Sequence, residues 1–428
     1  MSERDQRKVE VWADWTWLGA PIFMGTLTAA LVRGREVFSF EYAPAWLTGP
    51  HAQQLDPALR LFAGPHYAPV MQENFGLFLD SCPDRWGRVL MDRREAQLAR
   101  DENRKPRKLM GFDYLLGVHD LQRMGALRFR TASQGPFLDD LPHFVIPPWT
   151  SLRELEQVCL LLEGEHAVDH PAYAQWLAML IDPGGSLGGA RPKASVVDAQ
   201  GSLWIAKFPS RRDTFDIGAW EAVAHALAGQ CGVHVAPNQT RTFAGKHHTF
   251  LAQRFDRTST GGRMHFASAL TLLQRSDGDD AGTGACYLEL ADLLLRSGAH
   301  PVRDLEELWR RIVLFIAISN TDDHLRNHGF LLEPTGWSLT PAYDLNPDPH
   351  GAGLRLNITE TDNALALDLA REVAPYFRIA RSQAEEIITG VMTAVGRWRA
   401  VAKAQGISRD EQERMAPAFT AFSRHEPQ

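Results

Sequence analysis

The stretch Asn320-Thr321-Asp322-Asp323-His324-Leu325-Arg326-Asn327 follows the apolar run Ile312–Ile318 and decides the fold that we predict. It places Asp322 five residues before Asn327. Protein kinases use an Asp and an Asn at this separation, where the Asp accepts the proton of the substrate hydroxyl and the Asn holds Mg²⁺. A second acid, Asp344, follows at the distance at which kinases keep their other metal-binding Asp. The sequence therefore predicts a phosphotransferase.

Other segments match the remaining tasks of phosphoryl transfer, which are to position the γ-phosphate and to neutralise its charge. The Gly-rich segment Gly184–Gly189 can offer backbone N–H groups to phosphates. Lys207 ends a strand-like run and can reach the α- and β-phosphates, and Glu221 begins a helical run and could pair with that lysine. Asn327 and Asp344 supply the oxygen ligands that Mg²⁺ prefers.

Each of these features also has an ordinary structural interpretation. A Gly-rich segment is commonly a turn, a lysine at a strand end is commonly a surface charge, and Asp and Asn in polar loops commonly bind their own backbone. Glu221 could be a first-turn helix acid. The order of the features along the chain, with sensible spacings, favours the phosphotransferase.

The sequence lacks residues that two other enzyme classes require. A Walker-type phosphate loop requires Gly-Lys-Ser/Thr, whereas Gly189 is followed by Ala-Arg-Pro-Lys. His324 and His328 are four residues apart, but a zinc protease needs a Glu beside the first His, and Leu325 stands there. We expect His328 to be structural and His324 to orient the loop.

Composition is that of an ordinary globular protein, with 44% apolar and 23% charged residues in 428. The net charge of −7 argues against a protein that coats nucleic acid by charge alone. Residues 85–108 hold nine Lys/Arg against four Asp/Glu, which could form a phosphate-contacting face or a solvated helix.

Cysteine spacing and apolar runs bear on the compartment. The four cysteines are far apart and make no CxxC pair, which disfavours a zinc site or a disulfide framework. The N-terminus has no long apolar segment, and no apolar run approaches the ~20 residues of a membrane helix. We expect a cytoplasmic protein that does not bind membranes.

The pattern along the chain predicts an α+β fold. Short alternating segments over Val9–Tyr42 indicate hairpins, residues 86–100 and 151–181 indicate helices, and Pro136–Pro148 indicates a linker. Strand-like runs are expected at Lys193–Val197, Ser202–Phe208 and Thr249–Phe255, and mostly helices beyond Leu270. We place a β-rich N-terminal domain with helices at 1–135, a part with the Gly-rich loop and the lysine at 150–255, and a helical catalytic part at 256–428.

The chain resembles the HipA-type serine/threonine kinases of bacterial toxin–antitoxin modules, nearly end to end. The shared motifs are Phe75–Phe78, Pro83–Arg88, Gly125–Phe129, Ser186–Lys193, Ile205–Phe208, Gln253–Arg257, Asn320–Asn327 and Thr340–Asp344. The HRD, DFG and APE triplets of ordinary eukaryotic-type kinases are missing, as they are in this family. Arg326 departs mildly from the Lys often found at its position.

The resemblance implies a two-lobed, protein-kinase-like fold with an additional N-terminal β-rich domain and a mainly helical C-terminal lobe. It also implies the use of ATP and Mg²⁺, with Asp322 as base and Asn327 and Asp344 as metal ligands. The residues that it implies for ATP binding are Gly185, Ser186, Gly188, Gly189, Lys207, Gln253, Phe255 and Tyr343, with His324 beside the nucleotide.

The resemblance further implies partners and regulation. The typical partner is a small helix-turn-helix antitoxin of the HipB type, which would carry DNA binding for the complex. The substrate would be a protein, with aminoacyl-tRNA synthetases as examples in the family, and Ser186 would be an autophosphorylation site. A competing hypothesis is a catalytically degenerate kinase fold that acts only as a co-repressor. Intact Lys207, Asp322, Asn327 and Asp344 argue against it.

Overall fold

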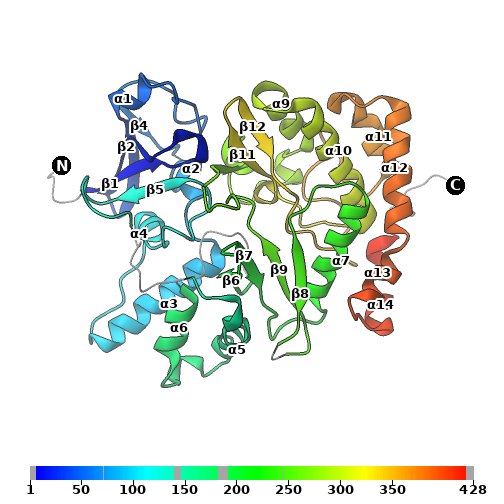
Figure 1. The fold of residues 1–428 in the computed structure, drawn as a ribbon, viewed down its shortest axis with the longest axis horizontal. Helices are drawn as coiled ribbons and strands as arrows, with labels where there is room; N and C mark the ends of the chain where they lie inside the picture. The colour runs from blue at the N-terminus through cyan, green and yellow to red at the C-terminus, as the bar shows by residue number, and fades with distance from the viewer. Residues whose placement is uncertain (1–5, 71, 139–145, 182–190, 244, 421–428) are drawn as a thin grey trace. The chain divides into compact units, whose positions relative to one another are not determined.

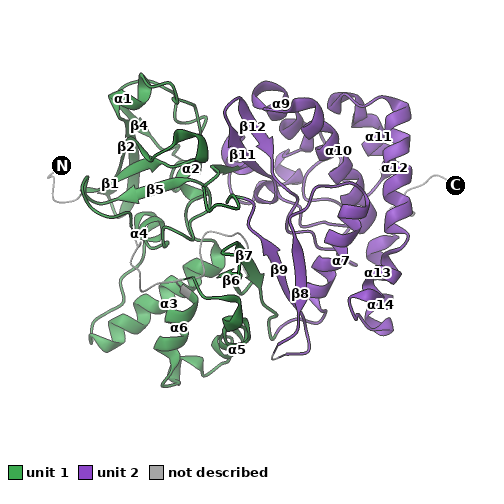
Figure 2. Cartoon of the chain, in the orientation of Figure 1, with its two compact units in different colours: residues 1–211, 256–267 green, residues 212–255, 268–428 purple. Residues whose placement is uncertain are grey.

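The structure is a computed structural model that describes residues 6–70, 72–138, 146–181, 191–243 and 245–420 (Figure 1). The chain forms two compact units, each of which uses two segments (Figure 2). Unit 1 comprises residues 1–211 and 256–267, and unit 2 comprises residues 212–255 and 268–428. These units group the chain differently from the three predicted domains, whose boundaries therefore stay a prediction.

Unit 1 is built on an antiparallel five-stranded sheet with the order β4-β3-β2-β1-β5. Its strands are β1 (Gln6–Ala13), β2 (Ile22–Val32), β3 (Arg35–Tyr42), β4 (Pro65–Tyr67) and β5 (Leu127–Arg130). Val9, Val11 and Ala13 alternate with more exposed residues and face the core. Arg33 and Gly34 both have positive φ, as a two-residue hairpin loop requires. The predicted N-terminal hairpins are confirmed.

The helices of unit 1 surround this sheet and a second hairpin. They are α1 (Pro44–Leu47), α2 (Gly76–Leu79), α3 (Arg85–Asp101), α4 (Gly111–Leu116), α5 (Leu152–Leu162) and α6 (Tyr173–Ile181). The hairpin consists of β6 (Lys193–Val197) and β7 (Leu203–Lys207), whose register sets Lys193 opposite Lys207. The predicted helix over 151–181 is two helices, and α3 packs against the second of them.

Segment 256–267 returns to unit 1 and is held by charged side chains. Asp256 Oδ2 accepts from the backbone N–H of Gly125 at 2.8 Å, and Arg257 donates to the carbonyls of Leu121 and Arg123. Gly125 has φ +75°, and a Cβ there would lie 3.0 Å from the Phe266 nitrogen. Only glycine therefore fits this turn without strain.

Unit 2 is mainly helical. Its helices are α7 (Ile217–Gln230), α8 (Ala269–Leu272), α9 (Tyr287–Ser297), α10 (Pro301–Ile318), α11 (Leu367–Val373), α12 (Arg381–Val395), α13 (Trp398–Ala404) and α14 (Arg409–Met415). Its hairpins are β8 (Asn238–Arg241) with β9 (Thr249–Gln253) and β11 (Gly329–Glu333) with β12 (Gly336–Leu339). A short strand, β10 (Phe266–Ser268), spans the sequence boundary of the two units.

Helix α10 is the core of unit 2. Proline occupies its first turn, and every residue from Ile312 to Ile318 is buried. It packs against α9, α11 and α12, which lie around it in Figure 1, and the indole of Trp309 donates to the carbonyl of Ala370 at 2.9 Å. This apolar half of the helix is buried on every side, whereas Val302 near the start of the helix is 69% exposed.

The predicted α+β class is confirmed, with a β-rich N-terminal part, a mainly helical C-terminal part and a kinase-like fold. The β11–β12 hairpin was not anticipated within the helical region beyond Leu270. Its first strand reads Gly-Phe-Leu-Leu-Glu and is buried on both faces, so it lacks the alternation that marks a half-exposed strand.

The buried ion pair between Lys193 and Asp84 tests the packing of unit 1. Lys193 Nζ lies 2.9 Å from Asp84 Oδ2, and the two side chains are 3% and 4% exposed. Asp84→Asn keeps a residue that can cap α3 but leaves a buried ammonium without its counter-charge. We expect the free energy of unfolding to fall by about 3–5 kcal/mol. Urea titration followed by tryptophan fluorescence measures it.

A matched control is Asp292→Asn, which breaks an exposed pair with Arg296. It should cost no more than about 1 kcal/mol, because both charges stay in water. Equal decreases in the free energy of unfolding in the two variants would show that the buried Lys193–Asp84 pair stabilises the fold no more than an exposed pair does.

A second prediction concerns pH and the start of α7. The hydrogen bond that His248 donates to the carboxylate of Asp216 raises the pKa of His248 above its ordinary value, against the lowering effect of burial. His248 Nδ1 lies 2.6 Å from Asp216 Oδ2, and Asp216 caps α7 through the N–H of Ala219. A raised histidine pKa stabilises the fold fully below the unfolded-state value of about 6.5 and loses this effect as pH rises through the folded value.

The difference in unfolding free energy between the wild type and His248→Ala should therefore be largest near pH 6 and should shrink toward pH 9. Urea midpoints across this range measure it. A difference that is constant with pH would contradict an ionic His248–Asp216 contact.

Candidate active site

The loop that carries the predicted base begins where α10 ends. Ser319 adopts a left-handed conformation with φ 48°, which stops the helix. Its hydroxyl donates to the carbonyl of Ala418 at 2.7 Å, and Asn320 Oδ1 accepts from the backbone of Asn346 at 3.1 Å. The start of the loop is thus fixed on two sides by segments distant in sequence.

The two adjacent acids of the loop have opposite environments. Asp322 is exposed, whereas Asp323 is 1% exposed. Asp323 Oδ2 accepts from the hydroxyl of Tyr287 at 2.6 Å and lies 2.8 Å from His328 Nε2. Burial, followed by the charge of Asp323, raises the pKa of Tyr287 well above its ordinary value. Asp322 is accessible to a substrate, and Asp323 serves the fold.

Asn327 is attached to the predicted base through the backbone. Its side-chain nitrogen donates to the carbonyl of Asp322 at 3.1 Å. Because that bond uses the amide nitrogen, it fixes which way the amide oxygen points, and only the oxygen is a ligand for a hard cation. The backbone N–H of Asn327 donates to the carbonyl of His324 at 2.8 Å, which closes a tight turn between them.

His324 is partly buried at the start of this turn. Its Nδ1 is shielded from solvent and has no hydrogen-bond partner among the described residues. His328 is almost fully buried against Asp323, Phe315 and Tyr287, in agreement with the structural role that we expected.

Asp344, the second predicted metal-binding acid, lies on a segment that contacts the loop Asn320–Asn327. The hydroxyl of Tyr343 donates to the carbonyl of Arg326 at 2.7 Å, and its ring lies 5.6 Å from that of Phe255. Asp344 has φ 58°, a conformation that non-glycine residues adopt rarely and that is frequent at functional sites. Phe255, Tyr343 and Arg326, one residue before Asn327, are therefore close together in unit 2.

Gln253 ends β9, and its backbone N–H donates to the carbonyl of Pro237 at 2.8 Å. The residues just before Pro237 also contact the segment that carries Asp344, since the N–H of Ala342 donates to the carbonyl of His234 at 2.7 Å. Residues 234–255 and 342–344 are thus neighbours within unit 2.

Lys207 ends β7, as predicted. It lies opposite Lys193 in an antiparallel pair, where two like charges repel each other. Asp84 compensates the charge of Lys193. The predicted roles of Lys207 and of the Gly-rich segment stay predictions, and Gly185, Ser186, Gly188 and Gly189 lie outside the described residues.

Sequence reasoning missed three residues of this site, Tyr287, Asp323 and Asp277. Asp277 Oδ1 accepts a hydrogen bond from Arg326 Nε at 3.0 Å, so the guanidinium of this loop residue is paired with a carboxylate. Tyr287 is 36 residues before Asp323, and no spacing rule connects them. Asp323 stood in the quoted stretch, but nothing local marks it as the buried member of the pair.

Part of the basic run over 85–108 is bonded to other residues of unit 1. At least five of its nine cations bond to the protein itself. The five are Arg88 to Glu73, Arg93 to the carbonyl of Leu162, Arg100 to Gln97, Arg104 to Glu95, and Arg107 to Asp113. This favours the solvated-helix interpretation over a phosphate-contacting face.

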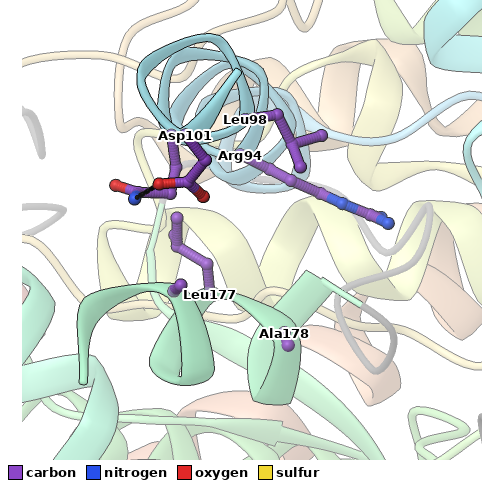
Figure 3. A pocket seen from close by; sticks show the side chains of 7 residues that line it. Arg94, Leu98, Asp101, Leu177 and Ala178 are labelled. Atoms are coloured by element: carbon purple, nitrogen blue, oxygen red, sulfur yellow. Dashed lines mark hydrogen bonds between the residues drawn. The ribbon is translucent and has the colours of Figure 1, made fainter. Parts of the chain in front are cut away.

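Unit 1 also has a small cavity of about 130 Å³ between α3 and α6 (Figure 3). Arg94, Leu98, Asp101 and Leu177 are among its lining residues, and none of the predicted site residues is. Ligand pockets usually measure about 300–1,000 Å³, so this cavity is too small for a nucleotide.

The described part of the chain holds no group of three or more His, Cys, Asp or Glu placed to bind a metal. All four cysteines are free and buried, and burial raises the pKa of both Cys82 and Cys231 to about 12. No described helix is long and apolar enough to cross a membrane.

Comparison with known proteins decides the family. The profile of the HipA-like C-terminal domain matches residues 185–398, which are 214 of the 428 residues and hence half of the chain. The chain belongs to the HipA-like family. The resemblance seen in the sequence motifs is thereby confirmed.

One curated protein and two solved structures are similar to this HipA-like chain. A "Putative kinase" of Haemophilus influenzae is 27% identical over 180 residues, which are 38% of this chain and about half (52%) of that protein. HipA of Shewanella oneidensis, solved with HipB and operator DNA, superposes with a TM-score of 0.64 at 18% identity and covers 94% of both chains. At this identity the likeness shows the fold. The Helicobacter pylori kinase CtkA matches 54% of the chain at 13% identity, with a TM-score of 0.35.

Because Asp323 is buried and Asp322 is exposed, substitutions at the two positions should change the free energy of unfolding by different amounts. Asp323→Ala should lower the free energy of unfolding by about 2–4 kcal/mol, because it leaves the Tyr287 hydroxyl and a His328 nitrogen buried without their partner. Asp322→Ala should stay within about 0.5 kcal/mol of the wild type, since its side chain is exposed. Urea unfolding followed by circular dichroism compares them. A larger loss for Asp322→Ala would contradict the assignment.

Proposed function

We propose that the chain is an ATP- and Mg²⁺-dependent protein serine/threonine kinase and the toxin of a toxin–antitoxin module. One observation carries the catalytic part. The loop after α10 buries Asp323, exposes Asp322 and ties the Asn327 amide to the Asp322 carbonyl. Family membership and the kinase named for the Haemophilus relative support it.

In this proposal Asp322 accepts the proton of the acceptor hydroxyl as that oxygen attacks the γ-phosphorus. A carboxylate that is exposed on a backbone fixed at both ends suits this task, because phosphoryl transfer depends mainly on positioning. His324 orients the turn between Asp322 and Asn327, and its shielded Nδ1 is available to a bound group.

The residues present fit a magnesium ion. Asn327 offers an amide oxygen whose nitrogen is already engaged, and Asp344 offers a carboxylate on the segment that contacts the same loop through Tyr343. Mg²⁺ is commonly bound by one or two protein oxygens together with phosphate oxygens and water. Bound there, it would neutralise the charge of the transferred phosphate.

The nucleotide would be held by the residues that the family resemblance implies. We assign phosphate contacts to Lys207 and to the segment with Gly185, Ser186, Gly188 and Gly189. The Gln253–Phe255 segment would face the adenine, with Tyr343 packed on Phe255. Autophosphorylation of Ser186 would add negative charge where ATP phosphates bind and would switch the kinase off.

The partner that we propose is a small helix-turn-helix antitoxin of the HipB type, because the Shewanella HipA was solved with HipB and operator DNA. DNA binding would depend on that partner, since this chain has a net charge of −7 and three cations of its basic run pair with carboxylates of unit 1. The substrate would be a cytoplasmic protein, with an aminoacyl-tRNA synthetase as the first candidate.

Substitution of the base separates catalysis from binding. Asp322→Asn should lower phosphoryl transfer by about 10²–10⁴-fold while Mg·ATP binding stays close to that of the wild type, because only the proton acceptor is lost. Asp344→Ala should instead weaken Mg·ATP binding, because it deletes an oxygen ligand. Transfer of ³²P from ATP and a fluorescent-nucleotide titration measure the two effects, with the exposed Asp292→Asn as control.

Wild-type turnover in Asp322→Asn would refute the assignment of the base. A wild-type chain that binds the antitoxin but transfers no phosphate to itself or to any protein of a bacterial extract would support the competing co-repressor hypothesis.

A further inference from the structure

We propose that Asp323 is a positioning residue for phosphoryl transfer, and that its carboxylate, held by Tyr287 and His328, sets the geometry of Asp322 and Asn327. This inference rests on the proposed kinase function. It assigns different tasks to two chemically identical neighbours.

Two donors converge on one oxygen of Asp323. Tyr287 Oη lies 2.6 Å and His328 Nε2 lies 2.8 Å from Oδ2. The side chains of Asp323 and His328 are 2% and 1% exposed, and Tyr287 is fully buried. Short bonds to a charged acceptor in such surroundings are about twice as strong as bonds between neutral groups. The Tyr287 and His328 rings pack edge to face at 5.7 Å, which restricts both donors.

The donors are themselves fixed by backbone contacts. Tyr287 is the first residue of α9, and its N–H donates to the carbonyl of Asn357 at 3.0 Å. The carbonyl of His328 accepts from the N–H of Ala269 at the start of α8 at 2.8 Å. The anchor for Asp323 therefore comes from three separate segments of unit 2.

The anchor acts on the reacting groups through the chain. Asp323 follows Asp322 directly, so a fixed Asp323 side chain fixes the peptide that carries the Asp322 carbonyl. That carbonyl accepts from the Asn327 amide at 3.1 Å, and the Asn327 N–H closes the turn to His324. Loss of the anchor would free the base and the metal ligand together.

Asp323 cannot be the base itself. Its carboxylate is shielded from solvent, and two protein donors occupy its Oδ2, so an incoming hydroxyl has no access to that oxygen. Its effect on the rate must pass through Asp322 and Asn327.

Tyr287→Phe tests the anchor with the least change in packing, because only the hydroxyl is removed. We expect kcat to fall about 10- to 100-fold, as expected for a misplaced reacting group, with the KM for ATP changed less than about threefold. Asp323→Asn, which can still accept from Tyr287, should keep more activity than Asp323→Ala. Tyr376→Phe, a substitution at a tyrosine that is 61% exposed, is the matched control and should leave kcat unchanged.

Backbone amide exchange supplies a readout that does not need turnover. The amides of residues 322–327 should exchange faster in Tyr287→Phe than in the wild type, while those of α10 and α12 keep their rates. Unchanged kcat together with unchanged exchange in residues 322–327 would overturn the inference. So would a loss of activity that is fully explained by a smaller folded fraction, with normal kcat per folded molecule.

The same experiment separates this inference from the proposed function. If the wild-type chain transfers no phosphate, the kinase assignment fails, and the exchange rates still decide whether Tyr287 and Asp323 anchor the loop. If the wild-type chain is active and Tyr287→Phe matches it in both readouts, the kinase assignment stands and the anchor fails.

Discussion

The burial of the C-terminal half of α10, from Ile312 to Ile318, is the constraint on which unit 2 depends. Every side chain from Ile312 to Ile318 is withdrawn from water, so the helix has one possible place in the fold and its C-terminal end has one possible position. Ser319 then turns the chain out of the helix in a left-handed conformation. The reactive loop starts from this rigid point. A loop that hung from an exposed helix would lack the precision that phosphoryl transfer demands.

Three buried charges, each with a partner, also fix the positions of their segments. Lys193 is held by Asp84, Asp120 is held by Arg128 and Arg263, and Asp323 is held by Tyr287 and His328. A buried ion that loses its partner is strongly destabilising, so such groups tolerate few alternative arrangements. They specify geometry more than they add stability, and they lie where segments distant in sequence must meet.

Several motifs that suggest chemistry turn out to serve structure. In Gln253–Arg257, the first three residues lie in unit 2, whereas Asp256 and Arg257 hold the Gly125 turn of unit 1. The same holds for Asp84, which caps α3 and pairs with Lys193. Residues of one family motif can therefore belong to different units and hold different parts of the scaffold.

The sequence by itself determined the fold class, the family and the order of the site residues. Apolar periodicity and turn residues act over a few neighbours, so the N-terminal hairpins, α3, α7 and the strand ending at Lys207 could be predicted from local pattern. The Asp322–Asn327 spacing also survives in the structure, because one tight turn joins the two residues.

Tertiary structure decided which of two identical residues takes which task. Asp322 and Asp323 have the same side chain, but Asp323 is buried against His328 and Tyr287, the latter 36 residues away, whereas Asp322 is exposed. Lys193 lies opposite Lys207 in a hairpin, and its ion-pair partner Asp84 is 109 residues away in the sequence. The β11–β12 hairpin was missed for a related reason, since burial on both faces erases alternation. Desolvation and charge pairing depend on residues that are distant in the sequence, so they cannot be predicted from a local sequence pattern.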